Sequence, residues 1–187
     1  MTRGSFDREY SASQDATLPA VPAPPAAAPL ITALLDSSGW RERELLGSAL
    51  VEVLNSAYAL APCAVKVADR TQVHSTDGRG RLARATYGYY RCRLPRAGAP
   101  QRCAIRIYHR TAVRGQVVSA TAFTNTLLHE WVHHYDFAGL GLRRSPHTSG
   151  FFTRLRQLRA QLLPEAERSR PGRTRGGSIK GDMSKEE

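Results

Sequence analysis

The sequence predicts an α+β fold, and three patterns along the chain lead to that prediction. Apolar residues recur at helical spacing from about Trp40 to Tyr58. Three strand-like runs follow, separated by turns rich in Gly and Pro. A second stretch with helical spacing begins near Ala120 and carries two histidines four residues apart. We therefore expect an N-terminal helix, a three-stranded antiparallel sheet, a histidine-bearing helix and a C-terminal helix.

The chain of 187 residues allows one ordinary domain flanked by tails. Residues 1–29 are rich in Ala, Pro and Ser and lack apolar periodicity, so a disordered tail is expected there. The run from Ser169 to Gly177 has no large apolar side chain, which predicts a flexible basic tail over 166–187. The folded domain is then expected over 30–165, a length adequate for one core.

Each predicted element has its own local signals. Ser38 can cap the first helix, which should pack over the histidine-bearing helix. The strands are expected at 64–69, 85–94 and 102–110, with turns at 77–80 and 95–100. The histidine-bearing helix should end near Gly139 and Gly141, and Thr148 or Ser149 can cap the last helix. The apolar positions expected to face the core in these two helices are Phe123, Leu127, Trp131, Tyr135, Phe151, Leu155, Leu158 and Leu162.

His129 and His133 carry the strongest chemical signal. On a helix a separation of four residues places both imidazoles on one face, where they can bind a single metal ion. Zn²⁺ held by such a pair lowers the pKa of a bound water, and the neighbouring carboxylate of Glu130 can take the proton. The pattern predicts a zinc metallopeptidase with Glu130 as general base. Tyr108, Tyr135 and the arginines are candidate donors to the oxyanion.

Two residues compete to be the third zinc ligand. His147 lies beyond the loop that follows the helix, at the start of the next helix, whereas Asp136 lies one turn after His133 but far from His129. Catalytic zinc needs three protein ligands and one open position, so we assign His147 as the third ligand. Asp136 is then a carboxylate that orients an imidazole or anchors the loop. His134 points to another side of the helix and is expected at the edge of the core.

Residues 128–134, followed by 147–152, resemble the metal-binding core of the SprT-like zinc metalloprotease family. The resemblance implies a small zincin domain with zinc ligands His129, His133 and His147, and a substrate protein bound or crosslinked to DNA. The chain departs from the family where His147 is followed by Thr148-Ser149-Gly150, because members usually have Gly directly after this histidine. It also lacks the four-cysteine zinc ribbon that many members carry at the C-terminus.

The formal net charge of +11 is concentrated in one part of the chain. Between Lys66 and Arg114 there are twelve basic residues and two acidic ones. Strand alternation predicts one sheet face with arginines interleaved with tyrosines, which suits phosphate contacts and base stacking in single-stranded or structured DNA. An ordinary solvated face is an equal alternative, and an edge strand could instead pair with an extended peptide substrate. The arginines of the candidate DNA-binding face are Arg91, Arg93, Arg106 and Arg110.

The compartment and the competing functions follow from simpler features. Three scattered cysteines, the lack of a secretory signal and the lack of a membrane-spanning segment indicate the cytoplasm. Cys92 and Cys103 are expected to pack as thiols across a hairpin. The leading hypothesis is a zinc metallopeptidase acting on a protein or peptide. The alternative is a basic nucleic-acid-binding module with a structural or vestigial zinc site, and the sequence gives no signal of oligomeric state.

Overall fold

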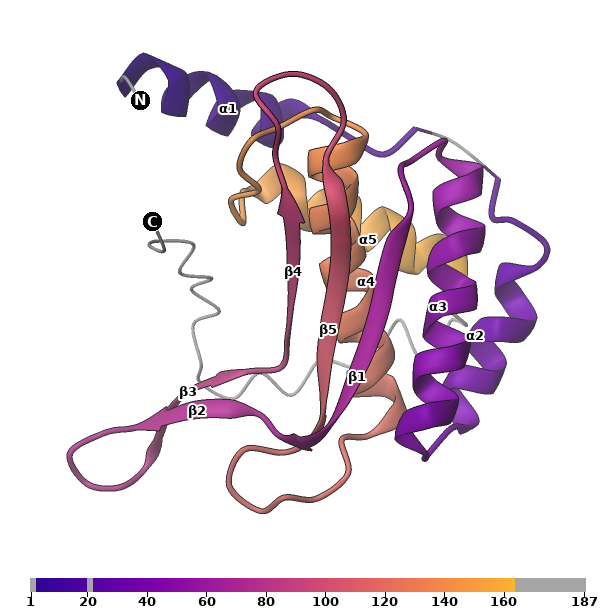
Figure 1. The fold of residues 1–187 in the computed structure, drawn as a ribbon, viewed down its shortest axis with the longest axis vertical. Coiled ribbons are helices and arrows are strands. Elements are labelled where there is room, and N and C mark those ends of the chain that lie inside the picture. Colours follow the sequence, from indigo (N-terminus) through magenta and orange to yellow (C-terminus); the bar gives the residue numbers. More distant parts are fainter. Residues whose placement is uncertain (1–2, 20–21, 164–187) are drawn as a thin grey trace.

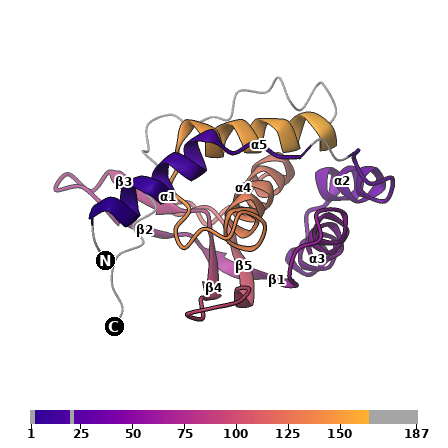
Figure 2. The ribbon, with the colours of Figure 1, turned by 90° about the horizontal axis from the view of Figure 1, so that it is seen from above.

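The computed structural model describes residues 3–19 and 22–163 and has the expected α+β class. A three-stranded sheet forms one layer, α4 lies across one of its faces, and α5 lies on the far side of α4 (Figures 1 and 2). Helices α2 and α3 lie together beside this stack, and no described helix covers the other face of the sheet (Figure 2). The helices are α1 (Arg3–Asp15), α2 (Ala27–Asp36), α3 (Trp40–Ala57), α4 (Ala120–Ala138) and α5 (Ser149–Leu162).

The sheet is mixed, so the prediction of a purely antiparallel sheet was wrong. Its strand order is β1-β5-β4, with β1 (Cys63–Thr71) parallel to β5 (Gln101–Arg110) and β4 (Gly88–Arg93) antiparallel to β5. A purely antiparallel sheet requires consecutive strands to pair with one another, which is the commoner arrangement. Here β5 lies between the two earlier strands, and the intervening chain makes a separate hairpin.

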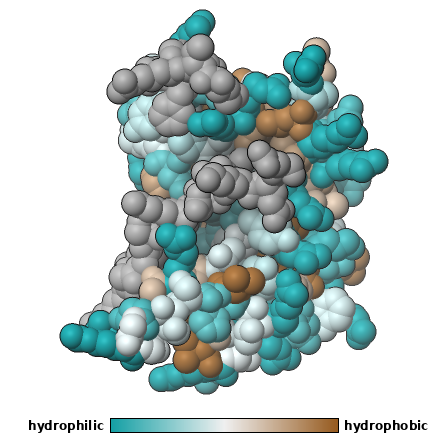
Figure 3. All heavy atoms as spheres, turned by 60° about the vertical axis from the view of Figure 1, so that its left-hand side comes forward, coloured by the Kyte–Doolittle hydropathy of each residue, from teal (hydrophilic) through white to brown (hydrophobic). Residues whose placement is uncertain are grey.

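That hairpin also divides the strand predicted at 85–94. Strand β2 (Val73–Thr76) pairs with β3 (Leu82–Thr86), and the chain then passes through Tyr87 into β4, which pairs with β5. β3 and β4 therefore belong to different sheets although they are nearly continuous in sequence. On the side of the hairpin, most of the visible surface is hydrophilic, with scattered apolar residues (Figure 3). A two-stranded ribbon of this kind gains little stability alone.

The N-terminal region differs from the expected disordered tail over 1–29. Helix α1 forms there and lies beside α5, and α2 begins at Ala27 (Figures 1 and 2). Pro29 is compatible with α2 because it lies in the first turn, where no backbone N–H is needed for the helix. Ala27, Ile31 and Leu34 share the buried face of α2. The tail expected over 166–187 lies outside the described residues.

Helix α4 occupies the centre of the core. Its predicted apolar side is confirmed, since Phe123, Leu127, Trp131 and Tyr135 are all at most 5% exposed. The Trp131 indole N–H donates to the side-chain carbonyl of Asn55 on α3, at 2.9 Å, which satisfies a polar group inside the core. No helix among the described residues is long and apolar enough to cross a membrane.

The helix caps agree with the sequence in one of two cases. Thr148 caps α5, and its side-chain oxygen accepts from the backbone N–H of Phe151 at 3.1 Å. Ser38 does not cap α3, because the helix begins one residue later and its N-cap is Gly39. The neighbouring Ser37 hydroxyl instead donates to the Leu34 carbonyl at the end of α2. The serine hydroxyl in the short connection between the two helices therefore bonds to the C-terminus of α2 and not to the N-terminus of α3.

Candidate metal centre

Three histidines converge at the end of α5 that adjoins α4. His129 and His133 come from one face of α4, and His147 lies just before the Thr148 cap of α5. The Nε2 atom of His147 lies 3.0 Å from Nε2 of His129 and 3.1 Å from Nε2 of His133. Zn–N bonds of about 2.0–2.1 Å in a tetrahedron separate neighbouring ligand atoms by about 3.3 Å. The three side chains are therefore close enough to bind one metal ion.

Burial keeps the rings of the two histidines on α4, His129 and His133, neutral. Burial lowers the pKa of His129 to about 3, with a further decrease from the nearby His147. Burial likewise lowers the pKa of His133 well below its ordinary value. The Phe151 ring lies against all three imidazoles, at centroid distances of 5.0 Å (His129), 4.6 Å (His133) and 4.8 Å (His147). Neutral imidazoles offer lone pairs, so this apolar support favours metal binding over protonation.

Ser145 and Asp136 fix the orientation of the His133 ring from the side opposite the other two histidines. The Ser145 hydroxyl donates to Oδ2 of Asp136 at 2.7 Å, so its oxygen is left to accept the N–H of His133 Nδ1, also at 2.7 Å. This contact leaves Nε2 of His133 unprotonated on the side of the other two histidines. Asp136 was expected to orient an imidazole. It does not contact His133 directly but holds the Ser145 hydroxyl that does. The loop containing Ser145 is anchored by the same bond.

Asp136 is itself paired inside the protein. Its carboxylate lies 2.9 Å from Nη2 of Arg154 on α5, and both side chains are 0% exposed. Burial raises the pKa of the Asp136 carboxyl, while Arg154 and Ser145 act in the opposite direction. Arg154 was not identified from the sequence. A signal was present, because it lies between Phe151 and Leu158 on the buried side of α5, and a charge at such a position needs a buried partner.

Glu130 is buried next to the edge strand β4. It is 6% exposed, and the backbone N–H of Tyr90 on β4 is close enough to favour its charged form. Burial raises the pKa of Glu130 to about 8, and the backbone N–H of Tyr90 opposes this increase. Gly88 allows β4 to approach α4, because a Cβ atom there would lie 2.9 Å from the Thr126 methyl and from the Arg106 carbonyl. The close approach brings the Tyr90 amide to Glu130.

The fourth histidine of the region, His134, was expected to be partly exposed or at the edge of the core, and it is instead fully buried and structural. His134 is 0% exposed, with Nε2 2.9 Å from the Ala61 carbonyl and Nδ1 3.1 Å from the Tyr90 hydroxyl. Nε2 must carry the proton to reach the carbonyl, so the Tyr90 hydroxyl donates to Nδ1. Both ring nitrogens are used. His134 therefore joins α4 to the segment between α3 and β1 and to β4.

The two tyrosines considered as oxyanion donors lie elsewhere. Tyr135 packs on the core side of α4, with its ring 5.9 Å from that of Trp131 and 5.8 Å from that of Tyr58. Tyr108 lies on the outer side of the sheet, 6.5 Å from the Tyr89 ring, with Arg70 over its face. Both tyrosine rings pack against other side chains and stabilise the fold.

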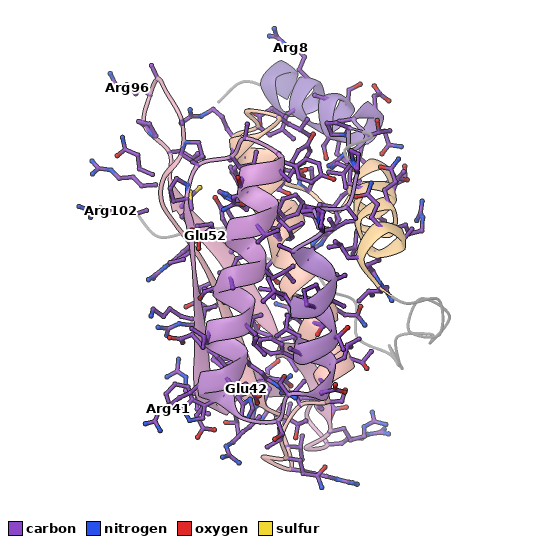
Figure 4. The ribbon with its side chains drawn as sticks, turned by 90° about the vertical axis from the view of Figure 1, so that its right-hand side faces the viewer. Arg8, Arg41, Glu42, Glu52, Arg96 and Arg102 are labelled. Carbon is purple, nitrogen blue, oxygen red and sulfur yellow. The ribbon has the colours of Figure 1, made fainter. Side chains whose placement is uncertain are left out.

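The candidate DNA-binding arginines are brought together on the outer face of the sheet, but not equivalently. Arg91 and Arg93 on β4 are exposed, whereas Arg106 is half-buried between Tyr89 and Lys66 in the strand register. Arg110 forms an ion pair with Asp69, with Nε of Arg110 2.7 Å from Oδ1 of Asp69. Figure 4 shows two further arginines, Arg96 and Arg102, that point away from the helices on the side of the sheet.

Comparisons with protein-family models, with curated proteins and with solved structures gave no match. The chemical interpretation of this centre therefore depends on the residues and geometry of the chain itself.

Proposed function

We propose that this chain is a cytoplasmic zinc metallopeptidase with a zincin-type centre, as the resemblance of residues 128–152 to the SprT-like family implies. The convergence of three imidazoles carries the proposal, because His129, His133 and His147 provide nitrogen ligands without a fourth protein ligand among the described residues. A structural zinc site usually has four protein ligands, while a catalytic one leaves a position open. The three free cysteines fit a reducing compartment.

The residues around the centre divide the chemistry of peptide hydrolysis between them. Zn²⁺ bound at the three histidines would polarise the scissile carbonyl group and lower the pKa of a coordinated water to about 7. Glu130 follows His129 directly on α4 and takes the proton of the attacking water, then delivers it to the leaving amine. The backbone N–H of Tyr90 opposes the effect of burial on the pKa of Glu130 and so favours the carboxylate form that acts as a base. Phe151 keeps the ligand side chains in an apolar setting.

The edge position of β4 supports a peptide as the substrate. β4 pairs with β5 on one side only, and α4 packs against it near the catalytic carboxylate. An extended peptide can add to such an edge through main-chain hydrogen bonds, largely independent of its sequence. This arrangement suits an enzyme that cleaves unfolded or extended segments of proteins.

Glu130→Gln tests the enzyme directly. The amide keeps the size of the carboxylate but cannot accept a proton, so cleavage of fluorescent casein should fall by about 10²–10⁴-fold while one zinc per chain is retained. Zinc content is measured by atomic emission on the purified chain, and cleavage is measured with single-stranded DNA present and absent. Wild-type protein that carries zinc but cleaves nothing under either condition would remove the peptidase proposal. So would full activity in the Glu130→Gln variant.

The outer sheet face supports a second candidate function, binding of single-stranded or structured DNA. No described helix covers this face, Arg91 and Arg93 are exposed on it, and the chain between Lys66 and Arg114 is strongly basic. Phosphate contacts by arginine release counterions, so affinity should fall steeply with salt. With peptidase activity, this face would bring the enzyme to DNA-associated proteins. Without that activity, the chain would be a nucleic-acid-binding module with a structural or vestigial zinc site.

A further inference from the structure

Helix α1 contacts the metal centre through a buried arginine. The Arg154 guanidinium donates to the backbone carbonyls of Ser13 at 2.8 Å and Ala16 at 2.7 Å, and to the Ser13 hydroxyl at 3.1 Å. The same guanidinium pairs with Asp136, which accepts from Ser145 next to His133. A continuous set of hydrogen bonds therefore runs from the C-terminal turn of α1 to one zinc ligand.

A second contact leads from the same residue of α1 to another ligand. The Ser13 side-chain oxygen lies 3.1 Å from that of Thr148, and both residues are buried. Thr148 directly follows His147 and caps α5, so its position fixes the backbone that presents His147. Ser13 is therefore linked to His133 through three side chains and to His147 through one. Both links cross from one end of the described chain to the other.

The fit between α1 and α5 requires the absence of a side chain at Gly150. A Cβ atom at this position would lie 2.3 Å from the Ser13 carbonyl oxygen and 2.2 Å from that of Gln14, far inside any allowed contact. The α1 backbone thus rests directly on the first turn of α5. A side chain at position 150 would therefore push α1 away from α5 and from the carbonyl bonds to Arg154.

We propose that α1 is a working part of the metal centre: its C-terminal turn positions His133 and His147, so that docking of α1 and metal affinity are coupled. This inference rests on the proposed metal site and adds its regulation. Arg154, Asp136, Ser145 and Ser13 are positioning residues, since they act on the ligands and do not touch the metal. Coupling is reciprocal, so bound metal must hold α1 in place to the same degree that α1 strengthens metal binding.

Gly150→Ala tests the coupling without altering a ligand or a polar side chain. The added methyl group displaces α1, while alanine favours the helix that it joins. We expect zinc affinity, measured by competition with a chromophoric chelator, to fall by about tenfold or more, as for other residues that support ligands. Co²⁺ substituted for zinc should give a changed visible absorption spectrum, because that spectrum reports the ligand geometry. Ser13→Ala should shift both readouts in the same direction.

Two control variants and a measurement on the wild-type chain complete the test of coupling between α1 and the metal site. Ser11→Ala on the exposed side of α1 and Gly78→Ala in open space should leave affinity and spectrum unchanged. In the wild-type chain, zinc should slow amide hydrogen exchange over residues 8–18, and Gly150→Ala should abolish that effect. If zinc binds but neither variant alters affinity or spectrum, or zinc leaves exchange over 8–18 unchanged, α1 is uncoupled and the peptidase proposal stands. A wild-type chain that binds no zinc overturns both proposals.

Discussion

Adjacent residues of α4 perform opposite tasks, and their partners decide which. His133 has its Nδ1 satisfied by Ser145 and presents Nε2 to the other ligands, whereas His134 has both nitrogens bonded within the fold. The same side chain is thus available to bind a metal ion in one position and bridges parts of the fold in the next. Helix geometry separates them, because consecutive residues point about 100° apart.

Two substitutions at the centre should separate metal binding from stability: one mainly lowers zinc affinity and the other mainly lowers the free energy of unfolding. His147→Ala should empty the site, because two imidazoles hold zinc weakly, yet the metal-free chain should unfold at nearly the wild-type temperature. Asp136→Ala should weaken zinc binding less. It should destabilise the metal-free chain by about 3–5 kcal/mol, because it leaves the buried Arg154 without its counter-ion.

Zinc titration and thermal unfolding of both variants check this contrast. The assignment of His147 as a ligand is contradicted if Asp136→Ala empties the site and His147→Ala does not. Ser38→Ala is a suitable control, since Ser38 is exposed and does not cap α3.

At the scale of elements, the approach of β4 to α4 joins the sheet to the helix that carries His129, Glu130 and His133. Gly88→Ala should force the strand away from Thr126, move Tyr90 away from Glu130 and lower the free energy of unfolding by about 1–3 kcal/mol. Peptidase turnover should decrease while zinc content is retained, because no ligand belongs to β4. Denaturant unfolding and the casein assay measure the two effects. Gly78→Ala is the matched control, and equal behaviour of the two variants would argue against a role for this contact.

At the scale of the whole molecule, the layers separate the two proposed activities. The metal centre lies on the helical side of the sheet, while the exposed arginines lie on its outer face. Arg93→Glu combined with Arg106→Glu should therefore weaken binding of single-stranded DNA and reduce its salt dependence without changing zinc content. Arg110 is left in place because it is paired with Asp69.

Fluorescence anisotropy across a salt series measures this prediction. Reversal of Arg8 and Arg156, on α1 and α5, changes the net charge equally and serves as the control, with a smaller expected loss of affinity. DNA binding that is absent at low salt, or unaffected by reversal on the sheet, would remove the nucleic-acid proposal and leave a metallopeptidase of unknown substrate.

The sequence alone determined the helical spacing of His129 and His133, the candidacy of His147, the apolar sides of α4 and α5, and a cap at Thr148 or Ser149. These features are local: a four-residue spacing, a helical period or a cap is set by residues within a turn or two of one another. The tertiary structure decided the place of β5 between β1 and β4, the docking of α1 and the buried set Arg154, Asp136 and Ser145. Those features join residues far apart in the chain through polar contacts, which leave no periodic pattern in the sequence.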